Sequence, residues 1–160
     1  MQTISSGVTV TVSSGTESGD TVLTGGTLIV VSGGSATGTT LSGGNEVISS
    51  GSVDSGATIL SGGSLNISSG GGSVSATVDA GGMLNVSSGG VASSIAVSSG
   101  GTLNVAGTVT SQVTVYASGL VVISSGGIET GAPGSNETIV SGGDRKSTRL
   151  NSSHGSISYA

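Results

Sequence analysis

The sequence predicts an all-β fold, a parallel β-solenoid of about seven coils with repeats of about 18–19 residues. Three observations predict this class. Glycine-marked turns recur at that interval, one place in every unit holds a β-branched aliphatic residue, and glycine recurs too often for helices between the turns. A unit with three to five apolar residues cannot build a core alone. The units must therefore stack and share one core, as coils of a solenoid do.

The first strand of each unit is predicted from two alternating columns. The units start at Gly7, Gly25, Gly43, Gly62, Gly81, Gly100 and Ser118, and Gly142 would open another. Counted from these starts, the sixth place holds Val12, Val30, Ile48, Ile67, Val86, Val105 and Ile123. The fourth place holds Val10, Leu28, Glu46, Leu65, Leu84, Leu103 and Val121. Alternate residues of a strand share a face, so both columns are predicted to point into the core.

A second strand is predicted just before the next glycine turn, where another apolar cluster recurs. Its members are Val22 and Leu23, Leu41, Ile59 and Leu60, Val78, Val97, Val115, and Ile139 and Val140. Each unit is therefore predicted as strand, turn, strand, turn. An antiparallel sandwich is the competing all-β fold, but it does not require one residue class at one place of every unit.

Glu46 is the one polar residue in the fourth column. Two interpretations stay open from the sequence. Either this place lies near a corner and the carboxylate reaches water, or a bulge lets Val47 take the inward position.

The charge pattern excludes several classes of partner. Residues 1–143 contain seven acidic side chains and no Lys, Arg or His. Phosphates and anionic lipids are held largely by cations, so nucleic acid and direct membrane binding are not expected. No apolar run is long enough to span a membrane, and no cysteine is present. The N-terminal residues do not look like an export signal, so the targeting segment of an exported protein would lie outside this chain.

No catalytic, metal or cofactor site is predicted. The acids fall at scattered places of the repeat and no basic partner exists before the tail, so a carbohydrate-active β-helix lacks its acid–base groups. The acids are predicted to be solvated surface groups. The threonines are predicted to fall at irregular places, which argues against an ice-binding face.

Three segments carry a family resemblance: VVSGGSATGTTLSGG at 30–44, NVSSGGVASSIAVSSGG at 85–101 and VISSGGIETG at 122–131. They resemble the repeat of AIDA-type self-associating autotransporter adhesins. The resemblance implies a bacterial cell-surface or secreted β-helix that binds host cell-surface molecules or copies of itself. It also implies sugars on some repeat serines, and the SSGG segments make Ser68, Ser69, Ser87, Ser88, Ser124 and Ser125 candidate acceptors. A structural spacer that presents another domain is the alternative function.

Three asparagines form a further candidate feature. Asn66, Asn85 and Asn104 recur at a constant interval at the fifth place of their units, between the two apolar columns. They are predicted to form an amide ladder on the outer strand face, either as reinforcement or as a strip that binds sugar.

The end of the chain breaks the pattern. Residues 1–143 are predicted to be the repeat domain and 144–160 a non-native tail that is loosely attached. DRKSTRLNSSH at 144–154 resembles the translation of a sequencing adapter, with Gly155 and Ser156 at its variable index. The last unit is longer and contains Pro133, which predicts a surface loop.

Overall fold

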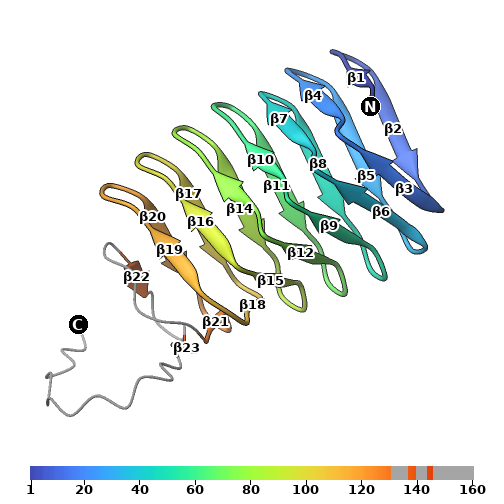
Figure 1. Cartoon of the computed structure of the whole chain (residues 1–160). Helices are drawn as coiled ribbons and strands as arrows, with labels where there is room; N and C mark the ends of the chain where they lie inside the picture. The colour runs from blue at the N-terminus through green and yellow to red at the C-terminus, as the bar shows by residue number, and fades with distance from the viewer. Residues whose placement is uncertain (131–136, 140–143, 146–160) are drawn as a thin grey trace, which may run out of the picture.

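The structure is a computed structural model that describes residues 1–130, 137–139 and 144–145 of the 160-residue chain. All described strands belong to three parallel sheets, and none of the described residues is helical. Successive coils lie side by side along one axis, so the chain forms an elongated β-solenoid (Figure 1). The predicted fold class, with about seven coils, is confirmed.

Sheet B contains the first strand of each predicted unit. Its strands are β2 (Thr9–Val12), β5 (Thr27–Val30), β8 (Asn45–Ile48), β11 (Ser64–Ile67), β14 (Met83–Val86), β17 (Thr102–Val105), β20 (Leu120–Ile123) and β22 (Glu137–Ile139). From β5 to β20, each strand pairs with its neighbours so that the fourth and sixth places of the units stay in register. Both columns point into the core, as predicted from their alternation.

Sheet A contains the second predicted strand. Its strands are β1 (Thr3–Ile4), β4 (Thr21–Leu23), β7 (Thr40–Ser42), β10 (Thr58–Ile59), β13 (Thr77–Val78), β16 (Ile95–Val97) and β19 (Val113–Val115). Val22, Leu41 and Ile59 are fully buried, whereas Leu23 lies on the outer face with 37% of its surface exposed.

Sheet C is a third strand per coil that the two-strand prediction missed. Its strands are β3 (Gly15–Ser18), β6 (Gly34–Thr37), β9 (Val53–Ser55), β12 (Gly72–Val74), β15 (Val91–Ser93), β18 (Thr108–Val109), β21 (Ile128–Glu129) and β23 (Asp144–Arg145). The paired inward residues along this sheet include Ala36, Asp54, Ser73 and Ala92. Small and polar residues give no hydrophobic alternation, so this strand carries no sequence signal of the usual kind.

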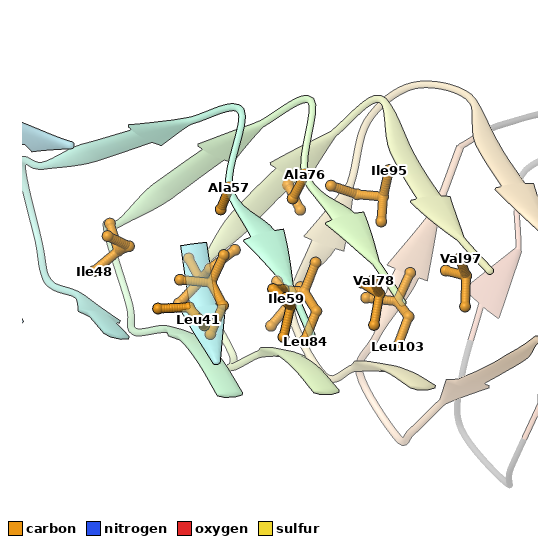
Figure 2. Close-up of a cluster of buried hydrophobic side chains, with 14 of the residues drawn as sticks. Leu41, Ile48, Ala57, Ile59, Ala76, Val78, Leu84, Ile95, Val97 and Leu103 are labelled. Atoms are coloured by element: carbon orange, nitrogen blue, oxygen red, sulfur yellow. The ribbon is translucent and has the colours of Figure 1, made fainter. Parts of the chain in front are cut away.

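The core is a file of aliphatic side chains along the solenoid axis. Figure 2 shows residues of several coils stacked in this file, among them Leu41, Ile59, Val78 and Val97 from sheet A and Leu84 and Leu103 from sheet B. No large aromatic side chain is needed, because three short strands enclose a narrow interior that each coil repeats.

Paired glycines close the corners for two separate reasons. Gly81 has a φ of 76°, a left-handed conformation that a residue with a Cβ adopts at a cost. Gly82 has no such φ, but a Cβ there would overlap the carbonyl oxygen of Ile59 in the coil below. The first glycine thus turns the chain, and the second allows two coils to approach.

The end of the repeat differs from the prediction. The segment Glu137–Ile139 pairs with β20, so Ile139 belongs to sheet B and not to a second-strand cluster in sheet A. β23, the described strand that follows Gly142 in the sequence, pairs with β21 in sheet C and not with a strand of sheet B. Glycine pairs occur both at the corner before a sheet B strand, as at Gly81–Gly82, and at the corner before a sheet C strand, as at Gly70–Gly71. A glycine pair in the sequence therefore does not show which strand follows it.

Part of the tail has a described position. Asp144 and Arg145 extend sheet C, in register with Ile128 and Glu129. Backbone pairing at a sheet edge needs no particular side chain, so the pairing does not depend on a repeat sequence. Pro133, Val140 and residues 146–160 lie outside the described residues, and the predicted origin of the tail stays a prediction.

Candidate functional site

The outer face of sheet B carries a ladder of asparagines. Asn85 Nδ2 donates to Asn66 Oδ1 over 2.8 Å, and Asn104 Nδ2 donates to Asn85 Oδ1 over 2.8 Å. The three residues are in register in β11, β14 and β17, as their spacing predicted. The ladder also continues to Asn45, whose Oδ1 accepts from Asn66 Nδ2 over 2.6 Å. Asn45 lies at the third place of its unit, and counting places alone could not find it.

The outer face of sheet A carries a column of threonines. Paired register places the side chains of Thr3, Thr21, Thr40, Thr58, Thr77 and Thr114 in one file, which Ala96 interrupts. We call this file the threonine column. The prediction that threonines fall at irregular places is wrong. Counted from the unit starts, Thr40, Thr58 and Thr77 all lie at the sixteenth place. Thr21 and Thr114 lie at the fifteenth place, and strand pairing brings them into the same file. Each threonine of the column presents one hydroxyl and one methyl group, and members on neighbouring strands lie about 4.8 Å apart.

The candidate glycan acceptors lie at the corner between sheets B and C. Ser69, Ser87, Ser88 and Ser125 are exposed, while Ser68 and Ser124 are half-buried. Exposed serines also occupy the corresponding corners of the preceding coils, at Ser32 and Ser50. Their segments depart from SSGG, so a search for that motif missed them.

The acids occupy the interior more than the surface, and the prediction that they are solvated is wrong for most of them. Asp20, Glu46, Asp54 and Glu129 have no exposed surface. Within residues 1–130 only Glu17 and Asp79 reach solvent, and both are half-buried. The side of the rod over this range is therefore polar but nearly uncharged, which corrects the acidic surface that the composition predicted.

Both interpretations of Glu46 are also wrong. β8 keeps its register with β5 and β11, so Glu46 lies between Leu28 and Leu65 with no bulge. Its side chain points into the core and none of its surface is exposed. Burial raises the pKa of Glu46 well above its usual range, and the neighbouring carboxylates of Asp54 and Asp20 raise it further.

Candidate metal ligands do not gather in the part of the chain that the structure describes. No three His, Cys, Asp or Glu side chains there lie close enough together to hold a metal ion. In the same residues, no helix is long and apolar enough to cross a membrane. The features that remain as candidates for recognition are the outward polar columns of sheets A and B and the exposed serine corners.

The chain is similar to a solved structure, a hyper-glycosylated fragment of TibA whose glycosylation was catalysed by TibC. The two share 32% sequence identity and superpose with a TM-score of 0.77 over 92% of this chain. The chain spans about half of that fragment, 53% of its length. No family model matches the sequence, and no curated protein matches it.

Proposed function

We propose that this chain is a non-enzymatic adhesion and self-association module of a bacterial cell surface or a secreted protein. The observation that carries the proposal is the threonine column, a file of outward hydroxyls over most coils of the rod that Ala96 interrupts. The resemblance of the repeats to self-associating autotransporter adhesins supports it, and so does the structural likeness to the TibA fragment.

The contact surface would be the side of the rod. Hydroxyls that repeat at the strand spacing offer a partner many weak hydrogen bonds in one line, and a second rod presents the same spacing. The partner would be a copy of the chain or a host surface molecule rich in hydroxyl groups. No cofactor is needed for such binding.

The near absence of surface charge favours contact between copies. Like charges on two approaching rods would repel, and each desolvated carboxylate would cost free energy. Four of the six acids within residues 1–130 are buried, so little repulsion opposes lateral approach. The composition predicted an acidic surface, but burial of these four acids leaves the side of the rod nearly uncharged over this range.

A structural spacer is the alternative function, since a stiff rod also holds a distal domain away from the cell. Display of residues 1–143 on bacterial cells through an unrelated anchor separates the two functions. The adhesion proposal expects displaying cells to clump or to bind host cells more than cells with the anchor alone. A spacer gives neither effect, and that outcome would remove the proposal.

We also propose that the exposed corner serines are sites of sugar attachment. Ser69 and Ser88 lie in neighbouring coils at the same corner, and the similar TibA fragment is glycosylated. Co-expression with TibC followed by intact mass measurement tests this modification. We expect added masses that correspond to whole sugar residues, and fewer of them in the Ser69→Ala, Ser88→Ala double variant. An unmodified mass would contradict the assignment.

A further inference from the structure

Glu46 has no hydrogen-bond donor for its carboxyl group. Neither Oε1 nor Oε2 has a hydrogen-bond partner, and the side chain has no exposed surface. The places above and below it in sheet B are Leu28 and Leu65, and Ile48 follows it on the inner face of the same strand. An ionised carboxylate in such surroundings would lose its hydration without any replacement.

Asp54 lies in the same coil, on β9 of sheet C, and it too is fully buried. Its surroundings differ, because Ser73 Oγ donates to Asp54 Oδ2 over 3.1 Å. The backbone amides of Ser55 and Ala57 also favour its charged form. Burial nevertheless raises the pKa of Asp54 to about 6, and Oδ1 has no hydrogen-bond partner. Of the two carboxyls, Glu46 is the one with nothing to stabilise a negative charge.

The other elements around Glu46 supply no counter-charge. β5 and β11 present aliphatic residues to the interior, and so does β4 through Val22. The titratable groups that act on Glu46 are Asp54 from β9 and Asp20 from the segment before β4, and both are acidic. Asp20 accepts from the backbone amide of Gln2 over 2.8 Å and lies 3.5 Å from the N-terminal amine. No Lys, Arg or His occurs before Arg145.

We propose that Glu46 is a proton-binding site inside the solenoid, and that loss of its proton as pH rises loosens the third coil, residues 43–61. The folded chain holds this proton because a buried carboxyl without donors is stable only in its neutral form. Asp54, beside it, ionises at lower pH. The coil therefore carries one buried charge at most until Glu46 also ionises.

The direction of the pH effect follows from linkage. The ordinary pKa values are 4.5 for Glu46 and 3.8 for Asp54, and the folded values of both are higher. Above the ordinary values the unfolded chain releases these protons while the folded chain keeps them. The folding equilibrium constant therefore falls up to tenfold per pH unit for each proton. The contribution of Asp54 ends at about pH 6, whereas that of Glu46 continues to higher pH.

Denaturant unfolding of the full 160-residue chain from about pH 4 to about pH 9 tests the proposal. Glu46→Leu places in β8 the residue that this column has in β5 and β11, so the variant is expected to fold. We expect its folding equilibrium constant to lose the decline of up to tenfold per pH unit that Glu46 causes in the parent chain. If the folding equilibrium constants of parent and variant change with pH in parallel from about pH 4 to about pH 9, the proposal is overturned.

Ser52→Ala is the matched control. Ser52 Oγ donates to Val30 O over 2.8 Å in the same coil, but the hydroxyl does not titrate. Its loss should lower the folding equilibrium constant by the same factor at every pH. A control curve that flattens with pH, as expected for Glu46→Leu, would show that any buried change in this coil alters the profile and would overturn the assignment to Glu46.

Two further measurements address Glu46 directly. Carbon NMR of the labelled carboxyl should show Glu46 titrating above the range of ordinary glutamates, with that signal lost in Glu46→Gln. Amide exchange in β8 should accelerate with pH more steeply than in β14, whose corresponding residue is Leu84. Titration of Glu46 at its ordinary pKa would overturn the proposal. A pH profile that shifts with added sodium or calcium would assign the site to a cation instead.

Discussion

Asn85 and Asn66 occupy the same place in consecutive coils, and their side-chain amides are joined over 2.8 Å. Each side-chain amide has both a donor and an acceptor, so each asparagine can donate to one neighbour and accept from the other. An uncharged ladder can therefore continue from coil to coil. The same contact is repeated by Asn104, and the ladder lies on the outer face of sheet B. It adds side-chain hydrogen bonds between parallel strands that are already joined by backbone hydrogen bonds.

Asn85→Ala should lower the stability of the chain more than Asn104→Ala does. Asn85 both donates to Asn66 and accepts from Asn104, whereas Asn104 takes part through one ladder bond. We expect a loss of about 1–2 kcal/mol for Asn85→Ala and roughly half of that for Asn104→Ala. Chemical denaturation measures both, and equal losses would show that the ladder bonds contribute little.

Ser75→Gly should stabilise the fold. Ser75 has a φ of 59°, at the corner position where Gly56 has a φ of 76° in the preceding coil. A residue with a Cβ is disfavoured in this conformation, and glycine recovers about 0.5–1 kcal/mol after its own entropy cost.

Gly56→Ser is the reverse substitution and the control. A Cβ at Gly56 would meet only the backbone nitrogen of Gly38, at 3.9 Å, so the change tests backbone conformation and not crowding. Thermal unfolding should show opposite shifts for the two variants. A lower unfolding temperature for Ser75→Gly would mean that the serine makes a contact worth more than its strain.

Gly82→Ala should be among the most damaging single substitutions in the rod. The added Cβ would overlap the carbonyl oxygen of Ile59, which belongs to the backbone and cannot move without separating two coils. We expect a loss of more than about 2 kcal/mol. Gly15→Ala, where a Cβ would meet nothing within 4 Å, should cost only the conformational penalty of its φ of 72°. Similar losses from both would contradict a steric role for Gly82.

The tail gives a prediction at the level of the gene. If residues 144–160 derive from an adapter, amplification of the gene from genomic DNA should give another sequence after Gly143. We expect that sequence to continue the repeat, because β22 and β23 are the terminal strands of their sheets among the described residues and a further coil would pair with them. Genomic codons that read through DRKSTRLNSSH would contradict the adapter origin.

Sequence reasoning found the parts of the fold where apolar residues alternate. The columns through Leu65 and Ile67 were predicted because large aliphatic residues recur at a fixed distance from the glycine turns. Sheet C was missed because its inner places hold residues such as Ala92 and Ser73, which no hydrophobic pattern distinguishes from a turn. The sheet C strand of each coil is recognised only from its pairing with the same strand of the neighbouring coils.

The candidate site was predictable in part, and for a related reason. The asparagines at 66, 85 and 104 lie in a stretch where successive units have the same length, so simple counting aligned them. In the threonine column, Thr40 and Thr58 share one place in their units, but Thr21 lies one place earlier, so strand pairing is needed to align all three. Burial of Glu46 and Asp54 contradicts the usual preference of carboxylates for water, and no rule based on residue type could have indicated it.

The most direct test of a binding role for the side of the rod is cell clumping by the displayed chain with an altered threonine column. Thr40, Thr58 and Thr77 would be replaced together by lysine, which places three like charges on one face, and by serine as the control that keeps each hydroxyl. The proposal predicts that the serine variant clumps as the parent does, and that the lysine variant loses clumping while its circular dichroism stays unchanged. Clumping of the folded lysine variant at the parent level would contradict it.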